Sequence, residues 1–141
     1  MRKYWIGVVS KKHIDRGVEG NFIQLCHGKE APLKRMAQDD VIFIYSPTIE
    51  LGSKEKYQCF SAIGKMKNDV IYPYEMSPDF TPNRRDVEFL ENIKPALIHD
   101  LIEELDFIID KKKYGAQFRF GHFEINQKDA MTIWNAMRLD K

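Results

Sequence analysis

Short apolar runs separated by polar turns dominate the chain, and their length and alternation favour strands over long helices. Such runs occupy residues 4–9, 22–26, 41–45, 57–66, 84–90 and 117–120. Residues 70–75 are expected to continue the fourth run or to pair with it after a turn at Asn68 and Asp69. Gly64 is expected to mark a bulge in that run. The pattern therefore predicts about six strands.

The remaining periodic stretches predict short helices. They lie at residues 11–16, directly after Pro32, at 93–105 and at 127–137. Ser10 and Asn126 are suitable N-caps for the first and the last of these. Residues 93–105 carry apolar positions at helical spacing, which predicts an amphipathic helix that packs on the sheet.

These elements lack the regular alternation of long strands and long helices found in a doubly wound sheet. Short twisted strands of this kind usually close into a small barrel flanked by helices. The chain has 141 residues, enough for one domain with a proper core and too few for two of ordinary size. We therefore expect a single α+β domain over residues 1–141, built on a small mixed β-barrel flanked by short helices.

Composition and charge limit the kinds of partner. The formal net charge is +1, so the field of the whole molecule cannot draw it to a polyanion, and any contact with nucleic acid must be local. Short basic clusters at residues 11–12, 34–35, 84–85 and 111–113 can each meet a few phosphates. Taken singly, each cluster is more simply interpreted as a solvated surface.

The sequence contains few signs of other chemistry. No apolar run approaches the length of a membrane span, and the N-terminus leads straight into a strand, so we expect a cytoplasmic protein without membrane contact. Cys26 and Cys59 form neither a disulfide framework nor a metal site and are expected to be reduced thiols. Phosphate-loop, hydrolase, metalloprotease and C-x-x-C motifs do not occur in the sequence. We therefore expect no metal and no cofactor.

Two pairs of neighbouring residues could suggest catalysis. Cys26 and His27 have the chemistry of a nucleophile and a base, but neighbours on a strand point to opposite faces and could not form a hydrogen-bonded dyad. Asp39 and Asp40 directly precede an apolar strand and fit a turn better than a pair of catalytic carboxylates. The protein is therefore not expected to be an enzyme.

Polar and aromatic residues interrupt the core pattern at two places. Gln24 lies in an apolar run, where its amide must point to solvent or find buried partners, although simple alternation between the two strand faces also explains it. Residues 72–82 contain three prolines, which excludes a regular helix and predicts an aromatic-bearing loop. Its Tyr74, Met76 and Phe80 either bind a partner or cover an open end of the core.

Several segments taken together resemble the EVE domain. They are YWIGVVS at 4–10, FIQLCHGK at 22–29, APLKRM at 31–36, IYSP at 44–47, RRDV at 84–87 and QFRFG at 117–121. The run at 22–29 is the most specific of them. EVE domains belong to the PUA-like superfamily of small barrels and are related to YTH domains, which hold a methylated adenine of RNA in an aromatic cage. The resemblance implies a PUA-like fold that binds a modified or flipped-out base.

A base pocket is then expected where the strands end. By order of elements, residues 9–11 correspond to the YTH strand end that contacts the nucleotide, and 22–26 to the strand bearing the first cage tryptophan. The sequence has no Trp there, which argues against a simple methyl-adenine cage. The expected base-binding residues are Ser10, Lys11, Gln24, Leu25, Cys26, Tyr45, Ser46, Tyr74, Met76 and Phe80. The expected phosphate contacts are Lys12, Lys29, Arg84 and Arg85.

We therefore expect a module that captures a single modified base of RNA or single-stranded DNA, because an extruded base needs apolar faces to stack on and hydrogen bonds along its edge. One alternative is an enzyme acting on a nucleobase or nucleotide, and another is a small interaction protein without a ligand. A carboxylate or histidine converging on the pocket would favour the enzyme. A pocket of amides, hydroxyls and aromatic rings would favour simple binding.

Overall fold

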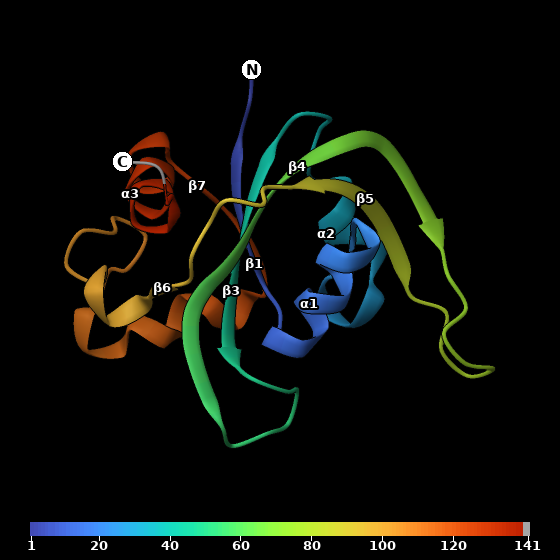
Figure 1. Ribbon diagram of the computed structural model, residues 1–141, viewed down its shortest axis with the longest axis horizontal. Helices are drawn as coiled ribbons and strands as arrows, with labels where there is room; N and C mark the ends of the chain where they lie inside the picture. Colours follow the sequence, from blue (N-terminus) through green and yellow to red (C-terminus); the bar gives the residue numbers. More distant parts are fainter. Residues whose placement is uncertain (140–141) are drawn as a thin grey trace.

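The computed structural model describes residues 1–139, and within them the strands form one mixed seven-stranded sheet (Figure 1). The strands are β1 Tyr4–Val8, β2 Phe22–Ile23, β3 Val41–Thr48, β4 Lys56–Pro73, β5 Asn83–Phe89, β6 Ala96–Leu97 and β7 His122–Ile125. The α-helices are α1 Lys11–Gly20, α2 Glu30–Lys34 and α3 Gln127–Met137. The 3₁₀ segments are η1 Cys26–Gly28, η2 Ile98–Asp100 and η3 Lys111–Phe120. No helix in this part of the chain is long and apolar enough to cross a membrane.

The sheet has the order β2-β5-β4-β3-β1-β7, and β6 pairs with β4. β1 runs parallel to β3, and all other neighbours are antiparallel. β2 and β7 end this order and do not pair with each other, so the described sheet curls without closing into a barrel. The α+β class and the short flanking helices are as predicted. Residues 70–73 continue β4 rather than starting a new strand, with a register shift between Met66 and Ile71.

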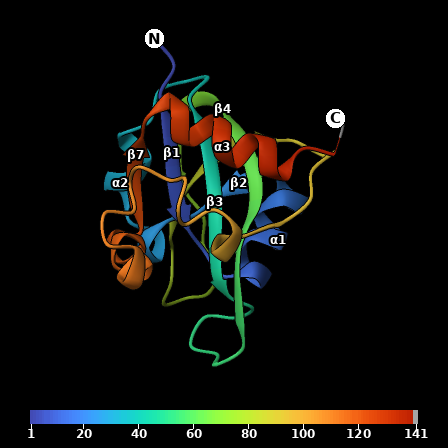
Figure 2. The same ribbon diagram turned by 90° about the vertical axis from the view of Figure 1, so that its left-hand side faces the viewer.

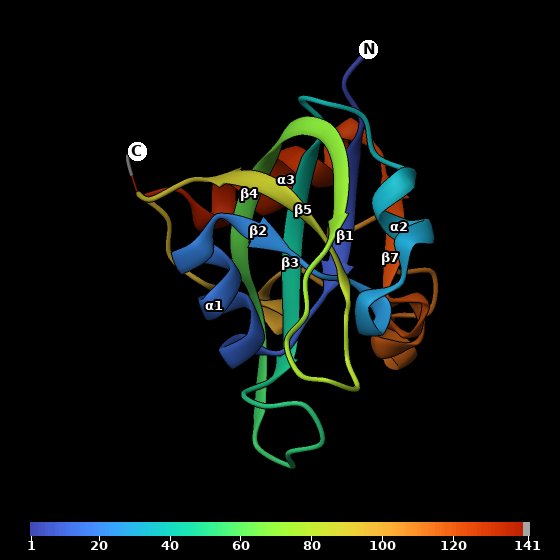
Figure 3. The ribbon, with the colours of Figure 1, turned by 90° about the vertical axis from the view of Figure 1, so that its right-hand side faces the viewer.

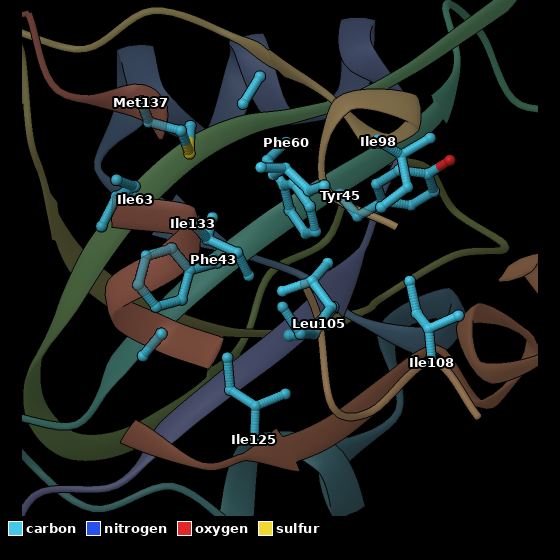
Figure 4. Close-up of a cluster of buried hydrophobic side chains, with 14 of the residues drawn as sticks. Phe43, Tyr45, Phe60, Ile63, Ile98, Leu105, Ile108, Ile125, Ile133 and Met137 are labelled. Atoms are coloured by element: carbon cyan, nitrogen blue, oxygen red, sulfur yellow. The ribbon is translucent and has the colours of Figure 1, made fainter. Parts of the chain in front are cut away.

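Two hydrophobic clusters cover the two faces of the sheet. The first lies under α3, η2 and η3 and contains Phe43, Tyr45, Phe60 and Ile133 (Figure 4). α3 lies across β1, β3 and β4 on that face (Figure 2). The second cluster fills the curl of the sheet, where α1 and α2 lie (Figure 3). Both clusters are built by the apolar alternation of the strands.

Two predicted elements are wrong. Residues 93–105 form β6, η2 and turns instead of an amphipathic helix, because β6 pairs with Cys59 and Phe60 of β4. Ile98, Leu101 and Leu105 are buried all the same. Residues 117–120 belong to η3 instead of a strand, and the next strand starts only after Gly121, whose positive φ of 76° lets the chain turn.

Gly64 does not form the predicted bulge, because it pairs in register with Ile42 and Phe89. A Cβ at this position would lie 2.3 Å from Val87 Cγ1, so glycine allows β5 to pass close over β4. The predicted N-caps also differ from each other. Asn126 accepts a hydrogen bond from the Asp129 amide, whereas the Ser10 side chain makes no capping bond.

His122 is expected to make the fold sensitive to acid. Its ring is 3% exposed and stacks on Trp5 at 4.8 Å, and neither ring nitrogen has a partner within residues 1–139. Burial, with a smaller contribution from Arg35, lowers its pKa to about 4. The unfolded chain, with an ordinary histidine pKa near 6.5, therefore takes up the proton first as the pH falls. Stability that is fully present above about pH 6.5 is lost progressively toward pH 4, by about 3 kcal/mol.

Urea unfolding at pH 7 and pH 4.5 measures this loss. His122→Phe keeps the aromatic contact with Trp5 and removes the titrating group, so its stability should change less between the two pH values. An equal loss for the wild type and the variant would show that other groups control the acid response.

Candidate functional site

A pocket of about 850 Å³ opens where several separate parts of the chain meet. Its walls come from the end of β1, one face of α1, the segment 22–29, the arm formed by residues 74–82, and the end of η3. The arm extends below β5, between α1 and the orange turns of η3 (Figure 3). A smaller pocket of about 440 Å³ lies beside α1 and β5, and its charged lining residues are the acids Asp15 and Glu91.

The most buried polar groups of the large pocket are Gln24 and Arg84, which are 4% and 9% exposed. The antiparallel register of β2 and β5 pairs Phe22 with Asp86 and Ile23 with Arg85, and continuing it brings Gln24 opposite Arg84. Arg84 Nε donates a hydrogen bond to Gln24 Oε1 at 2.6 Å. The contact is charge-assisted and fixes both side chains relative to each other.

Two aromatic rings hold the Arg84 guanidinium in place. Its central carbon lies 3.8 Å from the centroid of the Phe22 ring and 3.7 Å from that of Tyr74. A cation between two ring faces is attracted by both, and a planar guanidinium also stacks on them. The sandwich joins β2, β5 and the arm, so the arm is positioned by the same residue that faces the pocket.

The turn after β2 is left-handed over three consecutive residues. Cys26, His27 and Gly28 have φ values of 49°, 61° and 83°. Such values are uncommon for residues with a side chain and persist only where the surroundings impose them. Gly28 packs against Pro82 so closely that a Cβ would lie 2.4 Å from the proline Cβ, and Asn83 Nδ2 donates to the Gly28 carbonyl oxygen at 3.1 Å. The turn directs both Cys26 and His27 to the pocket.

Positive charge is concentrated at the pocket. Its lining contains five Lys or Arg side chains and one carboxylate, namely Lys12, Arg16, Lys29, Arg84, Arg119 and Glu50. Glu50 is itself paired with Lys12. Burial, followed by the nearby charges of Arg16 and Arg84, lowers the pKa of His13, which is therefore neutral at pH 7. A nearly neutral protein thus carries a local field that attracts anions.

Apolar side chains form the wall and rim of the pocket. Phe118 lines the wall and is supported from the core by Tyr45, whose ring stacks on it at 3.9 Å. The rim includes the exposed residues Met76, Phe80 and Phe120, and Phe120 is 69% exposed. Exposed aromatic rings beside positive charge suit a planar ligand that carries phosphate.

Residues 3–136 match the EVE domain family. The chain belongs to this family. A UPF0310 protein of Streptococcus mutans is 48% identical over 140 residues, which cover 99% of this chain and 100% of that protein. The UPF0310 protein YdcG of Bacillus subtilis is 45% identical over 134 residues, with coverage of 95% and 91%.

Solved structures share the fold of this EVE domain at low sequence identity. The Pho92 YTH domain in complex with m6A has a TM-score of 0.59 and 13% identity, covering 99% of this chain and 85% of that one. The ASCH protein of Zymomonas mobilis has a TM-score of 0.60 and 8% identity, covering 97% of both chains. These similarities confirm the PUA-like fold.

Five of the base-binding residues predicted for the EVE domain line its pocket: Ser10, Gln24, Cys26, Met76 and Phe80. Tyr74 contributes indirectly by stacking on Arg84. Whether these residues contact a base stays a prediction. Lys11 does not line the pocket, because its ammonium group pairs with Asp15 one turn along α1 and lies over Tyr57.

Leu25, Tyr45 and Ser46 were predicted to line the pocket, and the structure places all three in the interior. Leu25 belongs to the second hydrophobic cluster, Tyr45 lies behind Phe118, and the buried Ser46 hydroxyl is 2.7 Å from that of Ser61. β3 continues to Thr48, so Tyr45 and Ser46 are not at a strand end. Likewise, β2 ends at Ile23, and the argument that Cys26 and His27 lie on opposite faces of a strand is wrong. No hydrogen bond joins these two side chains within residues 1–139.

Of the predicted phosphate contacts, Lys12, Lys29 and Arg84 line the pocket of the EVE domain. Arg85 does not, because it is 1% exposed and its guanidinium donates to main-chain carbonyls inside the protein. Side chains alternate along β5, so Arg84 and Arg85 point to opposite faces.

Sequence reasoning missed several lining residues of the EVE domain, including His13, Arg16, Phe22, His27, Arg119 and Phe120. The run QFRFG at 117–121 contained a signal, since an arginine between two phenylalanines is typical of surfaces that stack bases and contact phosphates. His13 and Arg16 lie one turn apart on α1, so the helical period could have grouped them. No group of three or more potential metal ligands occurs among residues 1–139.

Proposed function

We propose that this EVE domain protein binds a single unpaired, modified base of RNA or single-stranded DNA in the pocket, without catalysing a reaction. The observation that carries the proposal is the buried Gln24–Arg84 pair, held between aromatic rings inside a basic pocket. A base taken out of its strand needs polar groups along its edge and apolar faces on which to stack, and the pocket offers both. Its volume of about 850 Å³ leaves room for a nucleotide.

The charge distribution supports a nucleic acid over a neutral ligand. Lys29, Arg16 and Arg119 make no ion pair within residues 1–139 and are available to the phosphates on either side of the base. A net charge of +1 is sufficient, because one captured base requires few phosphate contacts. The YTH neighbour was solved with m6A, which supports a base as the ligand of this fold.

Titration of short single-stranded RNA and DNA oligonucleotides, with and without common modified bases, tests the proposal. Fluorescence anisotropy at low salt should show tighter binding to at least one base than to an abasic site in the same strand. No difference between any base and the abasic strand would rule out capture of a base.

Gln24→Ala is expected to weaken binding of the preferred oligonucleotide by about 1–3 kcal/mol, because an oriented amide is removed from a largely desolvated pocket. The loss of stability should be smaller, about 1 kcal/mol, since Arg84 Nε loses one acceptor in a pocket that water can enter. Gln127→Ala, an exposed glutamine on α3, is the control and should bind like the wild type. Lower stability with unchanged affinity would remove Gln24 from the site.

An enzyme acting on a nucleobase or nucleotide is the second candidate. The observation favouring it is that His13 and His27 line the pocket beside Cys26, and that neutral His13 can accept a proton. Incubation with oligonucleotides and free nucleotides, followed by mass spectrometry, tests this candidate. A product formed by the wild type and not by His13→Ala would establish catalysis and overturn the proposal of binding alone.

A further inference from the structure

We propose that the pocket selects a base edge with two adjacent hydrogen-bond acceptors, such as N7 and O6 of guanine, and rejects the N6/N7 edge of adenine. The inference rests on the proposed function and specifies the ligand of the same site. It follows from the direction in which Gln24 and Arg84 can donate.

The orientation of the Gln24 amide is fixed by chemistry. Arginine Nε carries a hydrogen and has no acceptor capacity, so the atom of Gln24 that lies 2.6 Å away must be the oxygen. The amide nitrogen therefore points away from Arg84. It makes no hydrogen bond within residues 1–139, yet it keeps contact with the open volume of the pocket. Gln24 thus offers N–H donors to a ligand, while one of the two lone pairs of its oxygen is used by the positively charged Arg84.

Arg84 adds further donors on the same side of the pocket. Its Nε is used by Gln24, and neither terminal nitrogen has an acceptor among the described residues. The stacking of Phe22 and Tyr74 keeps the guanidinium from turning away. The two most buried polar side chains of the pocket therefore present mainly hydrogen-bond donors.

A donor-rich pair distinguishes the bases. A free glutamine reads adenine by accepting from N6 and donating to N7. In Gln24 the oxygen already accepts from Arg84, so an adenine bound in this way would place its N6 amino group, itself a donor, beside the donors of a cation. Guanine offers acceptors at both N7 and O6, the edge that arginine contacts most often. Cytosine offers a similar pair at O2 and N3. The carboxylate of Glu50, which could accept from an amino group, is paired with Lys12.

The same chemistry limits where a modification can lie. A methyl group on N7 of guanine removes an acceptor and adds bulk against Gln24, so N7-methylguanine should be rejected. A modification on another edge of the base leaves both acceptors free. The modified base of the proposed function therefore carries its extra group away from the edge that faces Gln24 and Arg84.

Oligonucleotides that vary at one position test the inference. Guanine or cytosine should bind roughly tenfold to a hundredfold more tightly than adenine at that position. If guanine is the ligand, 7-deazaguanine, which lacks N7, should lose most of this increase in affinity over adenine. If cytosine is the ligand, 3-deazacytosine, which lacks N3, should lose it instead. Equal or tighter binding of adenine, or full binding of both deaza bases, overturns the inference and leaves base capture intact. Equal binding of an abasic strand overturns base capture as well.

Gln24→Glu gives an independent test, because it replaces the donating nitrogen by an accepting oxygen and keeps the contact with Arg84. The ratio of guanine to adenine affinity should fall by about tenfold or more, with no decrease in melting temperature. Gln127→Glu adds the same charge on α3 and should leave the ratio unchanged. An unchanged ratio in Gln24→Glu overturns the inference.

Discussion

Arg85→Ala is expected to lower the free energy of unfolding by about 3–5 kcal/mol, the largest effect on stability of any single arginine in the described chain. The guanidinium donates to the carbonyl oxygens of Leu33, Met36 and Asn68, and pairs with Asp69. Its removal leaves buried carbonyl groups without a donor and opens a cavity in place of a large side chain. The bonds connect α2, the bend of β4 and β5, so the loss affects three elements at once.

Urea unfolding measures this effect against Arg35→Ala, an exposed arginine whose removal should change stability by less than about 0.5 kcal/mol. Arg85→Lys keeps the charge, but a lysine cannot reach all of the carbonyl oxygens. Its free energy of unfolding should therefore be lowered almost as much as that of Arg85→Ala. This variant also provides a measurable protein if Arg85→Ala does not fold. If Arg85→Ala were as stable as the wild type and bound oligonucleotides more weakly, Arg85 would be a phosphate contact, as the sequence predicted.

The strands were the part of the fold that the sequence could predict. Apolar alternation located β1, β3, β5 and the part of β4 up to Met66 to within a few residues, because these stretches bury one or both faces of the strand. The helix predicted over residues 93–105 is wrong because β6 and the turns bury Ile98, Leu101 and Leu105 at spacings that also fit a helix. Pairing of β6 with β4 decides between these alternatives, and local periodicity contains no information about it.

The site was predictable only in part. Gln24 could be identified because an amide in an apolar run needs a partner. Arg84 and Arg85 were both predicted to contact phosphate, although the alternation of a strand through residues 84–90 puts neighbouring side chains on opposite faces and could have separated them. The turn at 26–28 could not be identified, because its left-handed residues are imposed by the contact of Gly28 with Pro82, 54 positions away in the sequence. The contribution of η3 depends on how residues 111–120 pack beside β1, which is also a tertiary effect.

Arg84→Ala is expected to weaken binding of the preferred oligonucleotide by about 2–4 kcal/mol, more than any other single change in the pocket. Three contributions disappear together. The ligand loses charged donors, the Gln24 amide becomes free to turn, and Phe22 and Tyr74 lose the cation that keeps them apart. The slope of log affinity against log salt should also fall by roughly one if the charge meets a phosphate.

Two variants separate these contributions when anisotropy titrations are repeated at several salt concentrations. Arg84→Lys keeps the charge without the planar fork, so it should retain the salt slope and lose most of the preference for one base over another. Arg119→Ala removes a charge from the rim, so it should lower the slope and keep the preference, because the Gln24–Arg84 pair is intact. Arg84→Ala protein that unfolds at the wild-type temperature and discriminates bases as the wild type does would show that this pair does not read the base. The residue that contacts the base edge would then have to be sought among Ser10, His13 and His27, which are the hydroxyl and imidazole side chains of the pocket.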